Sequence, residues 1–173
     1  LTGRDLNAYI AAGLRSDHEC TSLDEAREKL RLGMHLFIRE GTQAKNLEAL
    51  LPLVTPATLH RCSFVTDDLH PHDILRHGHL DAVLDQAIGR GLDPLDAIAM
   101  VTLNTARYFG FRDRGAVAPG YRADLVLLSS LNPVRVEAVY RDGRRVYEGG
   151  SPILPPQGNA PAFRLSAMNV RPY

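Results

Sequence analysis

Three short predicted strands, each followed by ionisable residues, most constrain how this chain can fold. The clearest are apolar runs at residues 34–38 and 62–65, and a shorter one precedes Asp17. Helical patterns surround them; at residues 3–12, for example, Leu6, Tyr9 and Ile10 have the spacing of one helix face. Helices that alternate with short apolar strands are typical of a parallel sheet wound with helices. The fold class is therefore predicted to be α/β.

The pattern changes towards the C-terminus. A helix is predicted to begin at Pro94, and past Gly115 the sequence favours β structure. Residues 125–128 are predicted to form a buried strand, and residues 134–140 and 144–147 to form a hairpin about a turn at 141–144. From residue 151 onwards, Pro152, Pro155, Pro156 and Pro161 predict a linker.

The predicted strands deliver polar groups at the same end. Asp17-His18-Glu19, Arg39-Glu40 and Asp67-Asp68 follow the first, second and third strand. In parallel α/β folds, functional groups gather at the carboxyl ends of the strands. Imidazole and carboxylate are ordinary ligands of a divalent metal, which can activate water. We therefore expect a metal site at this rim, completed by ligands from elsewhere.

Two motifs near the third strand need not belong to a metal site. Asp67 or Asp68 alone could cap a helix that begins at Pro71. His70-Pro71-His72 and His77-Gly78-His79 have the spacing of a metal-binding pair, but neither is predicted to lie on a strand, although His70 could face the pocket. The sequence has no HExxH, PCxxC, glycine-rich phosphate loop or GxSxG motif, which argues against zincins, cytidine deaminases, P-loop proteins and α/β-hydrolases.

The composition of the chain limits the classes of partner that it is expected to bind. The chain has 173 residues with 20 basic and 20 acidic residues, so no basic surface indicates nucleic acid or an anionic membrane. No stretch is long and apolar enough for a membrane helix. Cys20 and Cys62 are far apart in sequence and predicted to be reduced, which favours a cytoplasmic location. The expected partner is a small molecule.

Several motifs resemble the bacterial adenine deaminases of the amidohydrolase superfamily. The resemblance covers nearly the whole chain, and its specific part lies within residues 3–68. The motifs are Gly3-Arg4-Asp5-Leu6-Asn7-Ala8-Tyr9, Ser16-Asp17-His18-Glu19-Cys20-Thr21, Ile38-Arg39-Glu40-Gly41, Ala44 to Pro52 and Val65-Thr66-Asp67-Asp68. Residues 113–126 are similar to the stretch by which amidohydrolases in general pass from the barrel into a small β domain.

The resemblance implies a fold and domain boundaries. Residues 1–110 would be the last three β/α units of a metal-dependent (β/α)8 (TIM) barrel, 111–150 part of a small β-sandwich domain, and 151–173 a linker into a further C-terminal domain. The chain would then be a fragment of a longer parent. The family's HxH pair, a glutamate and a further histidine would lie outside it.

The resemblance also implies site residues and an activity. His18 and Asp67 would be metal ligands, and Asp67 also the catalytic proton shuttle, with Asp68, Glu19, Arg39, Glu40 and His70 as neighbours of the substrate pocket. The parent would hydrolyse adenine to hypoxanthine and ammonia in purine salvage, with a binuclear centre of manganese, iron or zinc and as a homo-oligomer. The isolated fragment is expected to be inactive. The alternatives are a dihydroorotase-like or enamidase-like hydrolase of cyclic amides or amidines, and a non-catalytic scaffold or assembly fragment.

Overall fold

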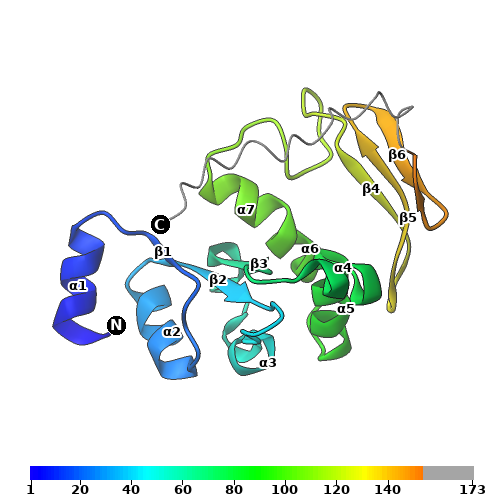
Figure 1. The fold of residues 1–173 in the computed structure, drawn as a ribbon. Coiled ribbons are helices and arrows are strands. Elements are labelled where there is room, and N and C mark those ends of the chain that lie inside the picture. Colours follow the sequence, from blue (N-terminus) through cyan, green and yellow to red (C-terminus); the bar gives the residue numbers. More distant parts are fainter. Residues whose placement is uncertain (154–173) are drawn as a thin grey trace, which may run out of the picture.

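A computed structural model describes residues 1–153 of the chain (Figure 1). Its first part is a parallel sheet of three strands in the order β1-β2-β3, with β1 at Ser16–Asp17, β2 at His35–Arg39 and β3 at Cys62–Val65. The sequence pattern therefore predicted the parallel sheet and its helical connections correctly. Within the described residues, β1 and β3 each pair on one side only.

Helices connect the strands and continue after them. They are α1 (Gly3–Ala11), α2 (Leu23–Arg31), α3 (Leu47–Leu50), α4 (Pro71–His77), α5 (Leu80–Gly89), α6 (Pro94–Val101) and α7 (Leu103–Tyr108), with short 3-10 turns at Leu51–Leu53 and Leu59–Arg61. Asp93 caps α6 by accepting hydrogen bonds from the amides of Leu95 and Asp96, as its position before Pro94 predicts. No described helix is both long enough and apolar enough to cross a membrane.

The two faces of the parallel sheet are covered differently. On one face, Leu36, Ile38 and Phe64 pack with α2, α3, α5 and α6 in the main apolar core, and each is at most 2% exposed. Complete burial of such a side chain stabilises a fold by about 1.5–3 kcal/mol. On the other face α7 crosses the sheet, opposite α2 and α3 (Figure 1). The Tyr108 hydroxyl donates to Ser16 Oγ at 2.7 Å.

His35 lies on the α7 face as a packing residue. Its ring is 4.8 Å from Phe37 and 4.7 Å from Tyr108 between centroids, and Nε2 is 2.9 Å from Ser63 Oγ. Burial, and to a lesser extent the charge of His60, lower the pKa of His35 from 6.5 to about 4. The folded protein therefore holds this imidazole neutral.

The burial of His35 predicts a loss of stability in acid. As pH falls from 6.5 to about 4, the unfolded chain binds a proton at His35 that the folded protein does not, so the free energy of unfolding decreases by up to about 3 kcal/mol. We expect His35→Phe to remove this part of the pH dependence, measured as the unfolding midpoint between pH 7 and pH 4. Equal pH dependence of the variant and the wild type would contradict the assignment.

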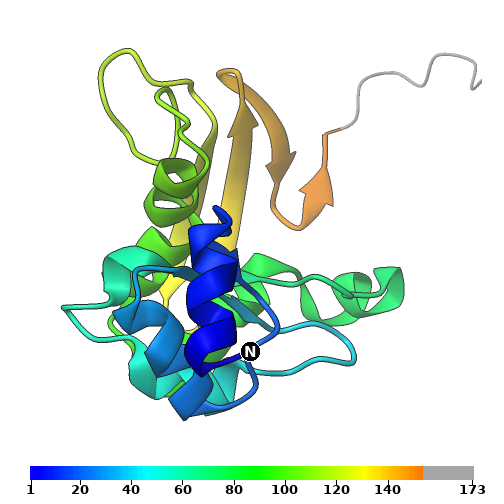
Figure 2. The ribbon, with the colours of Figure 1, turned by 90° about the vertical axis from the view of Figure 1, so that its left-hand side faces the viewer.

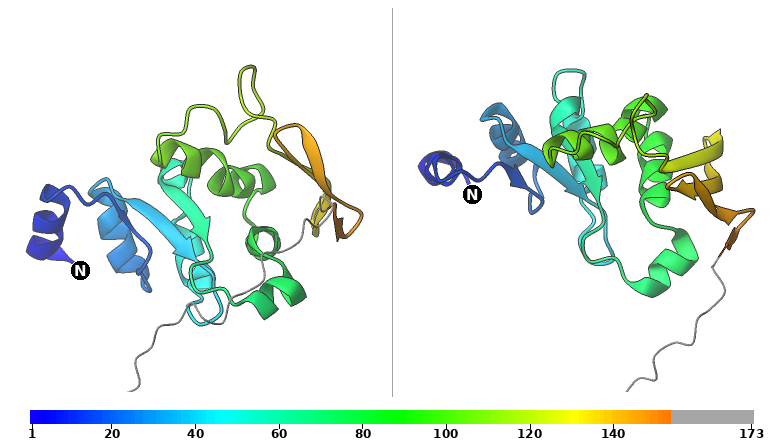
Figure 3. Two further views of the ribbon diagram at one scale, coloured as in Figure 1. Left: turned by 45° about the horizontal axis from the view of Figure 1, so that its top comes forward. Right: turned by 90° about the horizontal axis from the view of Figure 1, so that it is seen from above.

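The second part of the fold is an antiparallel sheet in the order β4-β5-β6-β7. Its strands are β4 (Leu125–Leu131), β5 (Val134–Arg141), β6 (Arg144–Glu148) and β7 (Ser151–Pro152). Figures 2 and 3 show this sheet projecting beyond the helices of the first part. It is joined to them where β5 packs on α5 and the Val134 amide donates to Asp85 Oδ1 at 2.7 Å. Asp142 and Gly143, both with positive φ, form the predicted hairpin turn.

Two sequence expectations for this region need correction. The strand predicted as buried is largely exposed, with Val126 at 57% and Leu127 at 47%, because none of the described elements covers that part of β4. Ser151 and Pro152, at the start of the predicted linker, pair with Glu148 and Tyr147 as β7. The rest of the predicted linker, from residue 154, lies outside the described residues. One described antiparallel sheet does not by itself make the expected sandwich.

Candidate active site

The carboxyl ends of β1, β2 and β3 form one rim, where an ion-pair network connects the strands. Arg39, the last residue of β2, donates from Nη1 to Asp67 Oδ2 at 2.8 Å and from Nη2 to Glu19 Oε2 at 2.9 Å. The hydrogen bond with Asp67 is the main reason that the pKa of Arg39 is raised above its ordinary value. The guanidinium therefore connects the segment after β1 with the segment after β3.

His18 and Asp67 both lie on this rim with accessible side chains. His18 is 50% exposed, and its Nε2 is 3.3 Å from Glu19 Oε1. Asp67 is 44% exposed and has a φ of 51°, a left-handed conformation that few non-glycine residues adopt. Glu19 connects His18 with Arg39, since its carboxylate contacts both the His18 ring and the Arg39 guanidinium.

Asp68 has a different role from its neighbour. Its Oδ2 accepts a hydrogen bond from the Gln43 amide at 2.7 Å, which is the main cause of a lowered pKa, and its Oδ1 is buried without a partner. A Cβ on Gly41 would lie 1.8 Å from Asp68 Oδ1, so only glycine fits there. The expectation that Asp67 or Asp68 caps the next helix is wrong, because His70 occupies the N-cap position of α4.

Glu40 and His70 lie away from the Arg39 network. Glu40 is buried, and its Oε2 accepts from the Leu47 amide at 3.1 Å at the start of α3. His70 is exposed, and its amide donates to Thr42 Oγ1 at 2.9 Å. Adjacent residues of an extended strand point to opposite sides, which explains why Arg39 faces the rim network and Glu40 faces α3.

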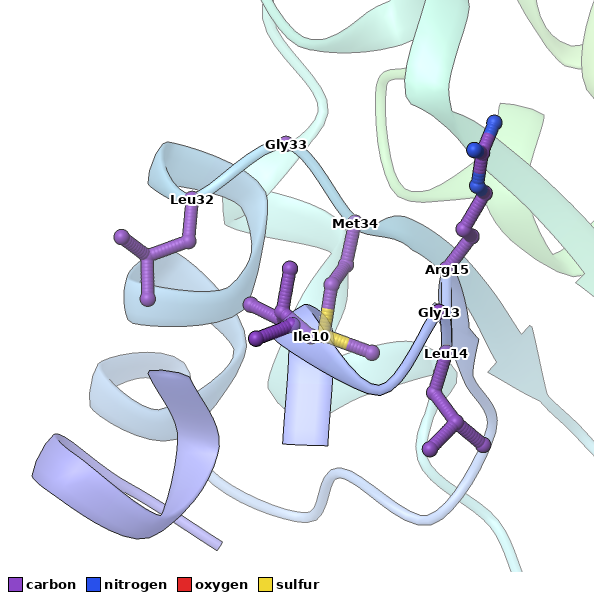
Figure 4. Close-up of a pocket in the computed structure, with 8 residues that line it drawn as sticks. Ile10, Gly13, Leu14, Arg15, Leu32, Gly33 and Met34 are labelled. Atoms are coloured by element: carbon purple, nitrogen blue, oxygen red, sulfur yellow. The ribbon is translucent and has the colours of Figure 1, made fainter. Parts of the chain in front are cut away.

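Two hollows lie at opposite ends of the strands. One, of about 480 Å³, is formed by the segments after β2 and β3, and its lining includes Glu40, Thr42, His72, Asp73, His77 and His79. The other, of about 400 Å³, is lined by Ile10, Gly13, Leu14, Arg15, Leu32 and Met34 (Figure 4). Arg15 and Met34 precede β1 and β2, so the second hollow lies at the amino ends of the strands, away from the rim.

The rim offers some of the ligands of a divalent metal. The accessible imidazole of His18 and carboxylate of Asp67 are suitable donors, but a catalytic metal ordinarily has at least three protein ligands. Within the described residues, two groups of three donors have their ligand atoms within 4.8 Å of one another: His70, His72 and Asp73, and Asp17, Cys20 and Glu25. Neither group contains His18 or Asp67. The donor chemistry of His18 and Asp67 therefore fits part of a metal site, and the described residues do not add a third donor to this pair.

Sequence reasoning missed two residues that shape the rim, Gly41 and Lys29. Gly41 permits the close approach of Asp68, and Lys29 contacts Asp17 at the end of β1. The sequence did hold a signal for Lys29, which lies on the same face of α2 as the apolar residues Ala26 and Leu30. A charged residue on a buried helix face needs partners of opposite charge.

Comparison with known protein families shows to which family this chain is related. The model of the amidohydrolase family matches residues 2–146, which is most of the chain. The chain belongs to the amidohydrolase family. Its curated relatives include proteins named adenine deaminase from Dehalococcoides mccartyi, 49% identical over 100% of this chain, and from Desulfatibacillum aliphaticivorans, 49% identical over 98%. This amidohydrolase chain spans 30% of the length of each of these relatives.

Solved structures support the same fold for this amidohydrolase. A beta-aspartyl dipeptidase from Fervidobacterium islandicum AW-1 superimposes with a TM-score of 0.60 at 16% identity, over 74% of this chain and 37% of that one. A second structure, titled an amidohydrolase, gives a TM-score of 0.55 at 20% identity, over 81% and 41% of the two chains. At these identities the likeness concerns the fold alone.

Proposed function

We propose that this chain is one segment of an adenine deaminase, a longer protein called the full-length enzyme below. The observation that carries the proposal is the rim on which Arg39 connects the His18–Glu19 segment with Asp67. The names of the relatives support the substrate. The full-length enzyme would convert adenine and water to hypoxanthine and ammonia.

The expected domain organisation supports the proposal. Residues 1–110 would be the last three β/α units of a (β/α)8 barrel, and residues 111–152, which include β7, part of a small β domain that is followed by a linker. The unpaired outer edges of β1 and β3 in the described sheet are where further barrel strands would pair. The missing metal ligands would come from those strands.

His18 and Asp67 would hold a divalent metal together with residues outside this chain. When bound, the metal would polarise a water molecule so that it ionises near neutral pH, and manganese, iron and zinc all suit such ligands. Cytoplasmic location and homo-oligomeric assembly stay predictions from the sequence.

Asp67 would move the protons of the reaction. As general base it would accept a proton from the water that attacks C6 of adenine, and as general acid it would pass that proton to the leaving amine. A C6–O bond forms, the bond from C6 to the exocyclic nitrogen breaks, and ammonia leaves. Arg39 would orient the Asp67 carboxylate through its 2.8 Å hydrogen bond. Asp68, Glu40 and His70 would shape the segments around the substrate pocket.

A substrate panel tests the proposal. We expect the purified full-length enzyme to release equal amounts of hypoxanthine and ammonia from adenine, and the isolated 173-residue chain to release neither. If the full-length enzyme instead prefers a cyclic amide such as dihydroorotate, the result would support the dihydroorotase-like alternative and contradict adenine deamination. Adenine turnover by the isolated chain would contradict the proposal that residues outside it complete the site.

A further inference from the structure

Lys29 is a buried cation on the face of α2 that packs against the sheet. It is 3% exposed, and its Nζ donates to Glu25 Oε1 at 2.7 Å, to Cys20 Sγ at 3.4 Å and to the carboxylate of Asp17. An ammonium group has three donors, and these three contacts use all of them. Lys29 therefore occupies the centre of the donor group Asp17, Cys20 and Glu25, where a cation is already supplied by the chain.

The contacts keep both partners of the Lys29–Asp17 pair charged. Burial by itself lowers the pKa of Lys29, but the carboxylates of Asp17 and Glu25 raise it above its ordinary value. Burial also raises the pKa of Asp17, and the hydrogen bonds from Lys29 and Glu19 lower it to a net value below normal. Because the cost of desolvating two charges offsets much of their attraction, such a pair is a weak source of stability. Its main consequence is the geometry that it imposes.

Asp17 transmits that geometry to the rim. One of its carboxylate oxygens contacts Lys29, and the other accepts a hydrogen bond from the Glu19 amide, so the turn that contains His18 is held against α2. The Glu19 side chain in turn contacts Arg39, and Arg39 contacts Asp67. A continuous series of contacts therefore runs from the buried cation of α2 to both proposed metal ligands.

We propose that Lys29 is a positioning residue of the active site, which fixes the backbone of His18 and Glu19 through Asp17. This inference rests on the proposed function, because the importance of His18 and Glu19 does. Lys29 lies on α2 and contacts Asp17, Cys20 and Glu25, so it would act on the site through Asp17. Its removal leaves the carboxylate of Asp17 without its cation and frees the turn to move.

Lys29→Met tests this in the full-length enzyme, with Arg27→Met as the matched control. Both variants remove a cation from α2, but the Arg27 side chain is 62% exposed and pairs with Asp24 on the same helix. For Lys29→Met we expect kcat for adenine to fall at least about tenfold, KM to stay within about twofold and metal per chain to fall, as substitutions behind metal ligands typically do. Arg27→Met should match the wild type. Unchanged kcat and metal content in Lys29→Met would overturn the proposal.

Hydrogen exchange supplies a readout that does not depend on activity. In Lys29→Met, amides in a peptide that covers residues 18–20 should exchange at least about tenfold faster, whereas a peptide that covers β2 should keep its protection. An equal increase in both peptides would show general destabilisation and overturn the positioning role. If Lys29→Met does not fold, Lys29→Gln is measured in the same way with the same criteria. If the wild type does not deaminate adenine, the proposed function fails, and the exchange measurement still decides whether Lys29 fixes this turn.

Discussion

Asp67→Asn in the full-length enzyme is expected to lower kcat for adenine by about 1,000-fold or more, while metal content largely survives. Positioned proton transfer contributes about 100- to 10,000-fold to catalysis, and an amide cannot take and return a proton. Asparagine has nearly the same shape as aspartate and keeps an oxygen that can accept the hydrogen bond from Arg39. Hypoxanthine formation and elemental analysis of the same preparation measure the two quantities.

Asp68→Asn is the matched control for that variant. Asp68 is adjacent in sequence, but its carboxylate accepts a hydrogen bond from the Gln43 amide, which an asparagine oxygen can also accept. We expect less than about a tenfold loss of kcat, as general acid–base catalysis does not pass through this residue. Activity of Asp67→Asn close to that of the wild type would remove Asp67 as the proton shuttle. A larger loss of kcat in Asp68→Asn than in Asp67→Asn would assign the role of proton shuttle to Asp68 in place of Asp67.

His18→Ala is expected to lower the metal content of the full-length enzyme by about one ion per chain, because a neutral imidazole ligand is lost. The His18 side chain is 50% exposed and lies outside the apolar core, so the fold should survive. Elemental analysis and the unfolding midpoint measure the two effects. The decrease in kcat for adenine should follow the decrease in metal.

His60→Ala is the control for the loss of a histidine. His60 is exposed in the 3-10 turn Leu59–Arg61 that precedes β3, so it lies at the opposite end of the strand from Asp67. We expect metal content and kcat to match those of the wild type. Full metal occupancy in His18→Ala would contradict the assignment of His18 as a ligand.

The rim could be predicted from the sequence because apolar strands with polar ends are a local pattern. His18 comes directly after β1, Arg39 is the last residue of β2 and Asp67 comes two residues after β3, so a parallel sheet must bring them to one side. The hydrogen bonds that distinguish Asp67 from Asp68 depend on Arg39 and on the Gln43 amide, which lie 28 and 25 residues away in sequence. No spacing rule predicts contacts of that kind.

Burial was harder to predict than the course of the chain. The apolar run in β4 has the composition of a buried strand, but exposure depends on what covers the sheet, and Val126 and Leu127 lie uncovered among the described residues. Lys29 shows the opposite case, a charged residue that is buried. It belongs to a residue type that is almost always exposed, and its burial becomes intelligible only when Asp17 and Glu25 are seen beside it.

The most direct test of the account is an anomalous diffraction map of the full-length enzyme, recorded at the absorption edge of the metal that it contains. We expect a metal peak about 2.0–2.2 Å from a ring nitrogen of His18 and from a carboxylate oxygen of Asp67. A peak bound by other residues, such as His70, His72 and Asp73, with neither His18 nor Asp67 as a ligand, would contradict the central claim.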